Sequence, residues 1–162
     1  MTEVTSWGRS GWAVGPGAGR QVDLPGPHRL EILLRGAEVD DAMGAFVFSH
    51  APITVNPPHA HLGYMKIIYV LEGTYEVRVG DAEFTAGPGS LVVVPKASQH
   101  TFTTRTGGRM LFACAPSGNE ELFLEQEKLG RNPTEEQLAD LRARMGTVEL
   151  NSHRMSTDGG ER

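Results

Sequence analysis

The chain has 162 residues, of which 39% are hydrophobic and 22% are charged, and its formal net charge is −5. These values are typical of one globular domain and exclude a disordered chain. The acidic balance argues against nucleic-acid binding, which normally needs a basic surface. No apolar run reaches the ~18 residues of a membrane helix, so we expect no membrane association. With no recognisable signal peptide and Cys114 as the only cysteine, we predict a cytoplasmic protein without an internal disulfide.

The N-terminal segment, residues 1–29, is rich in glycine and proline and is predicted to be an arm. Short edge strands are expected near residues 12–14 and 20–24. His28 lies in the turn sequence PGPHR, and we interpret it as a solvated turn residue because loops lie at the surface.

Residues 30–116 contain short β-type runs separated by turn residues, and this spacing predicts an all-β barrel or sandwich. Three prolines, Pro52, Pro57 and Pro58, are expected to interrupt regular structure before His59. Cys114 falls on the last run and is interpreted as a small core residue. The predicted strands cover residues 30–34, 45–50, 65–71, 74–79, 83–85, 90–94, 99–105 and 109–115.

The periodicity changes after residue 116, and residues 117–150 are predicted to form C-terminal helices. One helix is expected over residues 120–129. A second is expected over residues 134–145, where Thr134 and Gln137 have the spacing of a capping box. The last residues, 151–162, are polar and are predicted to be a flexible tail, in which His153 has no chemical role.

Three histidines have the pattern of a metal site. His59 and His61 are one residue apart next to a strand, so their imidazoles point to the same face. His100 lies on a predicted strand about 40 residues later, and strands that far apart can face each other across a closed barrel. Three inward imidazoles can bind iron, copper, zinc, nickel or manganese.

The motifs around these histidines resemble those of the cupin superfamily. The first motif corresponds to Pro58-His59-Ala60-His61 followed by Tyr69-Val70-Leu71-Glu72-Gly73, and the second to Gly87-Pro88-Gly89, Pro95, His100 and Phe102. The segment from Pro116-Ser117-Gly118 to Phe123 is similar to single-domain, quercetinase-like cupins. The resemblance implies a double-stranded β-helix, or jelly-roll barrel, with a helical C-terminal extension. It also implies one divalent first-row metal held by the three histidines, with iron as the first candidate.

The sequence departs from the family pattern at one ligand position. Cupins commonly carry a glutamate five residues after the second histidine, and this chain has Lys66 there. An ammonium group has no lone pair and cannot bind a metal. Two further differences, Ala97 in place of glycine and Thr104 in place of asparagine, do not involve ligands.

Three interpretations of Lys66 stay open. In the first, the histidines alone hold the metal and Lys66 binds an anionic or enolate oxygen of the substrate. In the second, no metal is bound, and Lys66, with a pKa lowered by burial, acts in proton transfer or as an electrophile. In the third, the site is vestigial, and Lys66 is merely tolerated there or extends its amine to the barrel mouth.

Other residues are candidates for the pocket because they share the inward face of neighbouring strands. His50 and Tyr64 join Lys66 as candidate catalytic residues. The candidate substrate-binding residues, besides Lys66, are Phe48, Gln99, Phe102, Met110 and Phe112.

The first functional hypothesis is a metal-dependent oxygenase that acts on an enolisable, phenolic or polyketide-like secondary metabolite, a substrate class that the resemblance implies. The alternatives are a non-redox cyclase, isomerase or epimerase, with or without metal, and a non-catalytic binding cupin. We expect a homodimer, because the barrel has exposed edges and the tryptophan-containing arm can pack on a partner chain.

Overall fold

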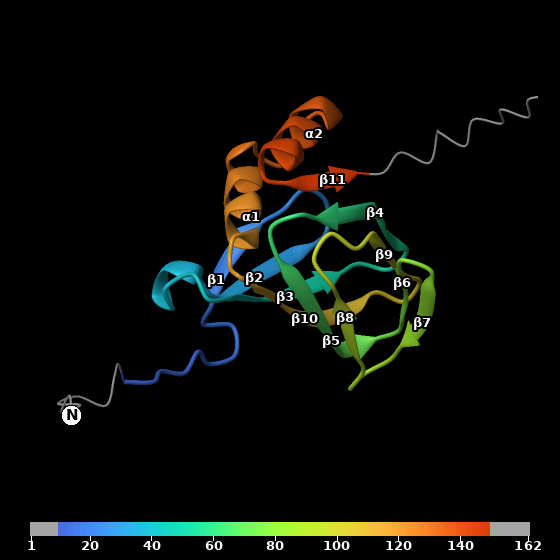
Figure 1. The fold of residues 1–162 in the computed structure, drawn as a ribbon, viewed down its shortest axis with the longest axis horizontal. Coiled ribbons are helices and arrows are strands. Elements are labelled where there is room, and N and C mark those ends of the chain that lie inside the picture. Colours follow the sequence, from blue (N-terminus) through green and yellow to red (C-terminus); the bar gives the residue numbers. More distant parts are fainter. Residues whose placement is uncertain (1–9, 150–162) are drawn as a thin grey trace, which may run out of the picture.

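The structure of the protein, a computed structural model, describes residues 10–149. The first nine residues of the predicted arm, and the predicted tail with His153, lie outside the described residues. Ten strands precede two helices (Figure 1), which is the order that the sequence predicts, although the strand over residues 54–61 was not predicted. The strands are β1 (Arg20–Asp23), β2 (Arg29–Leu34), β3 (Gly44–His50), β4 (Thr54–His61), β5 (Met65–Gly73), β6 (Tyr75–Val79), β7 (Ala82–Ala86), β8 (Leu91–Val94), β9 (His100–Thr104) and β10 (Gly108–Ala115).

The strands form two antiparallel sheets that pack face to face. One sheet has the order β1-β2-β3-β10-β5-β8, and the other has the order β11-β4-β9-β6-β7, in which β11 is the C-terminal strand Thr147–Glu149. Strands distant in sequence are therefore neighbours, as β3 and β10 are in the first sheet and β4 and β9 in the second. This arrangement is a jelly roll, and it confirms the predicted all-β fold class.

Alternation along β5 decides which side chains face the interior. Lys66, Ile68 and Val70 are buried, whereas Tyr69 and Leu71, which alternate with Ile68 and Val70, are exposed. The period of two is the ordinary consequence of strand geometry. It places the Lys66 side chain on the same inward face as the aliphatic core.

The core between the sheets is aromatic and aliphatic. Phe46 and Phe112 stack with ring centroids 4.8 Å apart, and Phe123 packs against both from the first helix. Cys114 is buried, which confirms its interpretation as a core residue. At the junction of β5 and β6, Gly73 has a φ of 81°, and a Cβ there would overlap the Gly107 carbonyl oxygen, so only glycine fits.

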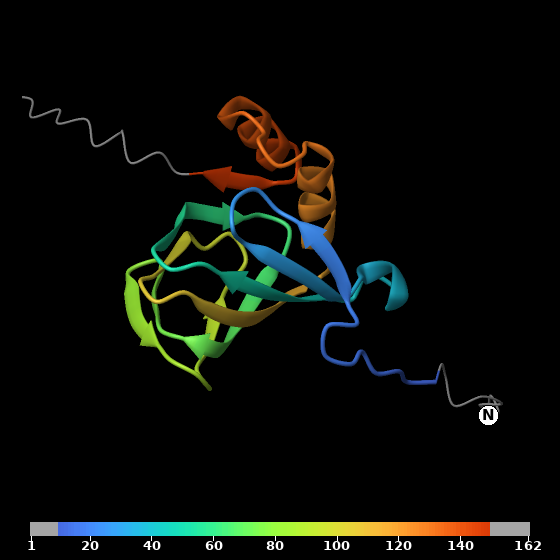
Figure 2. The ribbon, with the colours of Figure 1, turned by 180° about the vertical axis from the view of Figure 1, so that it is seen from behind.

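The C-terminal segment covers one end of the barrel, where Figures 1 and 2 show both helices on the same side. Helix α1 spans Asn119–Lys128 and α2 spans Glu135–Arg144, and the predicted capping box between Thr134 and Gln137 is confirmed. A further strand, β11 (Thr147–Glu149), pairs with β4 and was not predicted. None of the described helices has the length and apolar character to span a membrane.

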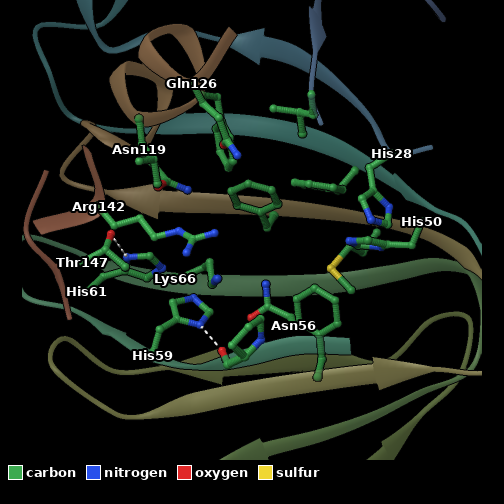
Figure 3. Close-up of a pocket in the computed structure, with 18 of the residues that line it drawn as sticks. His28, His50, Asn56, His59, His61, Lys66, Asn119, Gln126, Arg142 and Thr147 are labelled. Carbon is green, nitrogen blue, oxygen red and sulfur yellow. Dashed lines mark hydrogen bonds between the residues drawn. The ribbon is translucent and has the colours of Figure 1, made fainter. Parts of the chain in front are cut away.

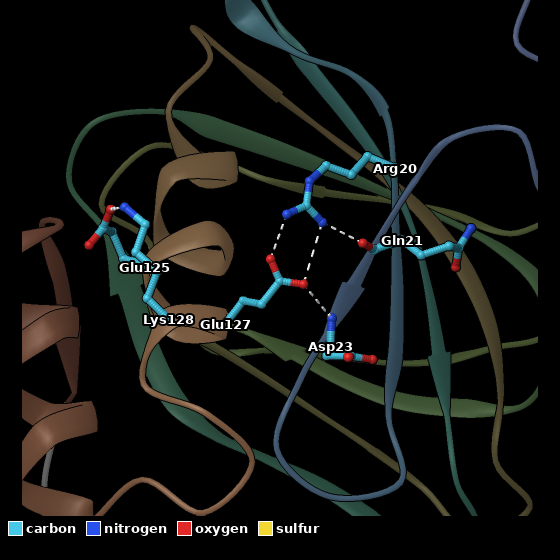
Figure 4. Close-up of polar contacts among 6 residues, drawn as sticks. All are labelled: Arg20, Gln21, Asp23, Glu125, Glu127 and Lys128. Carbon is cyan, nitrogen blue, oxygen red and sulfur yellow. Dashed lines mark hydrogen bonds and ion pairs between the residues drawn. The ribbon is translucent and has the colours of Figure 1, made fainter.

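Helix α1 is tied to the first strand by one carboxylate. Glu127 accepts hydrogen bonds from the Arg20 guanidinium at 2.5 Å and from the Asp23 backbone N–H at 3.0 Å (Figure 4). These contacts hold the helix beside β1. They fix one wall of the pocket described below.

Three local predictions were wrong. Residues 12–14 form no strand, and Trp12 is exposed. Pro57 and Pro58 do not end regular structure, because β4 continues through them with a register shift between Asn56 and His59. His28 is not a solvated turn residue, because it is partly buried and lines the barrel pocket.

Candidate metal centre and pocket

His59, His61 and His100 meet inside the barrel, as the sequence predicts. One nitrogen from each ring lies within 4.8 Å of the others. His59 and His61 come from the end of β4, and His100 comes from the start of β9, which pairs with β4 at His59. All three side chains are largely shielded from solvent.

Each imidazole is oriented through its Nδ1 atom. His59 donates its Nδ1–H to the Pro57 carbonyl at 2.7 Å, and His100 donates its own to the Ser98 carbonyl at 3.1 Å. Nδ1 of His61 lies 3.3 Å from the Thr147 hydroxyl. With Nδ1 occupied, the Nε2 lone pairs are free to bind a metal. The Nε2 atom of His100 is buried and has no hydrogen-bond partner, as expected for a ligand atom.

The three rings are neutral at physiological pH. Burial, reinforced by the positive charge of Lys66, lowers the pKa of His59 to about 4 and the pKa values of His61 and His100 to about 2. Neutral imidazole is the form that binds metals. The residues present therefore fit a divalent transition metal with three nitrogen ligands.

Lys66 lies beside the histidines, and its side chain is only 7% exposed. Its ammonium nitrogen is 5.4 Å from the centroid of the Phe112 ring. Burial lowers the pKa of Lys66 to about 8, with a small opposing effect from the Cys114 thiol. At pH 7 the site therefore keeps a desolvated positive charge next to the candidate ligands.

Two residues of the C-terminal segment complete the pocket beside His61, and neither was predicted from the sequence. Thr147 contacts His61 from β11. Arg142 of α2 extends its guanidinium into the pocket above His61 (Figure 3), and its charge helps to lower the pKa of His59. Arg142 lies four residues after the buried Leu138, so the helical period could have placed it on the inward face.

His59, His61 and Lys66 border a cavity of about 290 Å³, near the lower end of small-molecule sites. Its lining is largely apolar and aromatic, with His59, His61 and Lys66 toward one end and His28 and His50 at the other (Figure 3). The lining residues from the barrel strands are Phe48, His50, Asn56, Pro57, His59, His61, Lys66, Ile68, Phe102, Met110 and Phe112. Those from the flanking segments are Leu24, Pro25, His28, Asn119, Leu122, Phe123, Gln126, Leu138, Arg142 and Thr147.

His50 lies at the opposite end of the cavity from His59 and His61 (Figure 3). Its Nδ1 is 3.0 Å from the Tyr75 hydroxyl, and its ring stacks on Phe48 with centroids 4.4 Å apart. Burial lowers the pKa of His50 to about 3. His50 is thus a pocket residue, but it is not grouped with the metal-binding nitrogens.

Two of the candidate catalytic and substrate-binding residues lie outside the cavity lining. Tyr64 stacks on His61 with centroids 4.7 Å apart and donates its hydroxyl to Asn119, and burial raises its pKa well above the usual range. Tyr64 therefore packs against the candidate ligand His61 without lining the cavity. Gln99 is exposed just before β9 and does not line the cavity, so its predicted contact with substrate was wrong.

The comparisons with known proteins agree with this geometry. The family model for the cupin domain matches residues 46–115, which include all three histidines and Lys66. No curated protein matches the sequence significantly.

Solved structures with low sequence identity share the fold. KdgF from Halomonas sp. superposes with a TM-score of 0.61 at 18% identity, covering 69% of this chain and 99% of that one. An RmlC-like cupin from Shewanella frigidimarina NCIMB 400 superposes with a TM-score of 0.60 at 19% identity, and the match covers 69% of this chain and 96% of that one. The cupin domain of Schizosaccharomyces pombe Cnp3 superposes with a TM-score of 0.53 at 17% identity, and the match covers 68% of this chain and 72% of that one. Together with the family-model match over residues 46–115, they show that this chain has the cupin fold.

Proposed function

We propose that the protein is a metal-dependent enzyme that acts on a small anionic or enolisable organic substrate inside the cupin barrel. The observation that carries this proposal is the combination of three converging, neutral imidazoles with Lys66 at the usual carboxylate position. A site without a carboxylate ligand keeps a higher positive charge when a divalent metal is bound. Such a site favours a substrate that supplies the missing negative charge itself.

The chain's own residues have separate tasks in this proposal. His59, His61 and His100 hold the metal, which supplies Lewis-acid or dioxygen chemistry when it is bound. The ammonium of Lys66 and the guanidinium of Arg142 bind the carboxylate or enolate oxygen of the substrate. The aromatic middle of the cavity holds the carbon skeleton and excludes water.

Oxygenation of a phenolic or polyketide-like compound is the finer form of this proposal. An enolate held beside an iron ion is electron-rich, and the apolar walls formed by Phe48, Phe102 and Phe112 suit an aromatic body. Loading the protein with Fe(II) anaerobically and measuring dioxygen consumption with a panel of enolisable acids tests this form. If the substrate is converted without dioxygen, the oxygenase proposal is contradicted and the non-redox alternative is supported.

One observation favours the second candidate, a cyclase, isomerase or epimerase. The pKa of Lys66, lowered to about 8, makes a fraction of the amine neutral near physiological pH and available as a base. In this case Lys66 accepts the proton that is removed from the substrate. The oxygenase and the proton-transfer enzyme thus differ in whether Lys66 stays charged.

Metal analysis separates the two candidates. Protein purified without chelators or metal-affinity chromatography should contain about one metal ion per chain, as expected for a three-histidine site, and H100A should lose it. K66E should bind metal more tightly, because it restores a carboxylate at the ligand position. A metal-free wild-type protein that is active, and inactive as K66A, would overturn the metal-dependent proposal and support proton transfer by Lys66.

The homodimer stays a proposal, and the outer face of β5 and β8 supports it. Tyr69, Leu91 and Val93 are exposed there, and β8 is an edge strand. Apolar side chains on an open edge are typical of a surface that pairs with another chain. Light scattering should report a dimer for the wild type and a monomer for L91K/V93K. A monomeric wild type would contradict the proposal.

The cytoplasmic location stays a prediction.

A further inference from the structure

The end of the cavity away from the metal centre holds a second polar cluster, formed by His28 and His50. His28 comes from the loop between β1 and β2, and His50 is the last residue of β3. Their ring centroids are 5.8 Å apart in an edge-on arrangement. Figure 3 shows the two imidazoles next to each other at this end, apart from His59, His61 and Lys66.

The hydrogen-bonding capacity of this pair is incompletely used. Nδ1 of His28 is buried and has no hydrogen-bond partner. His50 engages Nδ1 with the Tyr75 hydroxyl at 3.0 Å, which leaves its Nε2 for another contact. A buried polar atom without a partner costs free energy, about 1–3 kcal/mol, unless a ligand or water satisfies it.

The surroundings of the pair exclude a charged ligand group. His50 is stacked on Phe48 and lies with its edge toward Phe102, at 4.9 Å between ring centroids. Burial lowers the pKa values of both His28 and His50, so neither ring is charged at neutral pH. A neutral imidazole offers one donor and one acceptor, which a hydroxyl group can match with its own acceptor and donor.

We propose that His28 and His50 form a subsite that binds a hydroxyl group of the substrate. This inference rests on the proposed function and adds the substrate class to it. The substrate is an elongated molecule with an acidic head at Lys66 and Arg142. It has an apolar, preferably aromatic, body between Phe102 and Phe112, and a neutral hydroxyl at the far end. Hydroxylated aromatic acids have this pattern.

Two pairs of probe acids test the subsite in the full-length, zinc-loaded protein by isothermal titration calorimetry. The pairs are benzoate with 4-hydroxybenzoate and trans-cinnamate with trans-4-hydroxycinnamate, which place the hydroxyl at two distances from the acid. In at least one pair the hydroxylated acid should bind about tenfold more tightly, the effect of one well-placed hydrogen bond. H28L should reduce this ratio to about one and leave the affinity of the unhydroxylated acid within about threefold.

Three further variants separate the possible failures. K66M should weaken all four acids, and Q126M, which changes another polar residue of the cavity lining, should leave the ratio intact. Should H28L not fold, H50Q takes its place. Equal binding within both pairs, or loss of the ratio in Q126M instead of H28L, would overturn the subsite while the proposed function stands. If none of the acids binds, or if K66M has no effect, the anion site of the proposed function fails and the subsite proposal falls with it.

Discussion

The Thr147 hydroxyl lies 3.3 Å from Nδ1 of His61, and the two residues face each other across the β4–β11 pair. His61 is thereby oriented by a residue 86 positions later in the chain. The C-terminal segment is thus part of the candidate metal centre and not an appendage to the barrel.

This contact predicts that T147V weakens metal binding about 10- to 100-fold, the usual effect of removing a group that orients a ligand. Valine keeps the β-branched shape that suits the strand, so the fold should be retained. Competition with a chromophoric chelator measures the affinity for zinc. T147S keeps the hydroxyl and is the matched control; equal affinities for T147V and T147S would contradict the role of the hydroxyl.

Removing the buried charge of Lys66 should stabilise the protein. The pKa of Lys66 is about 8 in the folded state, against an ordinary value of 10.5, so burial of the charged form costs about 3 kcal/mol at pH 7. K66M should raise the free energy of unfolding, measured with urea, by up to that amount. K96M alters an exposed lysine and should have no effect.

The same shift predicts how stability depends on alkaline pH. Between pH 8 and 9.5 the folded state has lost the Lys66 proton and the unfolded state still binds it, so stability rises with pH. The rise from this group should be about 1.5 kcal/mol in the wild type and absent in K66M. If the free energies of unfolding of the wild type and K66M change equally with pH across this window, Lys66 is not buried as a charge.

Acid should destabilise the metal-free protein, and the buried histidines set the pH range. The folded-state pKa values of His50, His59, His61 and His100 lie between about 2 and about 4, below the ordinary value of 6.5. The unfolded state therefore binds more protons below pH 6.5, and stability is lost as the pH falls. Each histidine contributes up to about 1.4 kcal/mol per pH unit.

Urea unfolding in the presence of a chelator, repeated from pH 7.5 to pH 5, measures this loss. H50Q should reduce the number of protons taken up on unfolding by about one, because it removes one of the four groups. An unchanged slope in H50Q would mean that His50 titrates normally in the folded protein.

Ala97 adopts a left-handed backbone conformation, with a φ of 62°, at a position where cupins usually have glycine. Its N–H donates to the His61 carbonyl at 2.9 Å, so the strained turn supports the metal centre. A97G removes about 1–2 kcal/mol of strain but adds flexibility to the unfolded chain, and we expect a net gain of up to about 1 kcal/mol. Thermal unfolding measures the change, and a lower melting temperature for A97G would contradict it.

The sequence was most informative where the structure depends on local pattern. Period-two alternation predicts that Lys66 faces inward with Ile68, and one-residue spacing places His59 beside His61. The capping box at Thr134 likewise depends on neighbours within one helical turn. Each of these features is decided within a few residues, so each can be predicted without knowledge of the chain path.

His28, Arg142 and Thr147 could not be assigned to the pocket in the same way, although the helical period could place Arg142 on the inward face of α2. Each reaches the cavity because a distant segment folds back onto the barrel: the β1–β2 loop, helix α2 and strand β11. Such contacts depend on sheet order and helix packing, which no local period encodes. By itself the sequence determined the barrel, the three histidines and the lysine among them. Only the tertiary structure decided what closes the pocket, because closure depends on contacts between residues far apart in the chain.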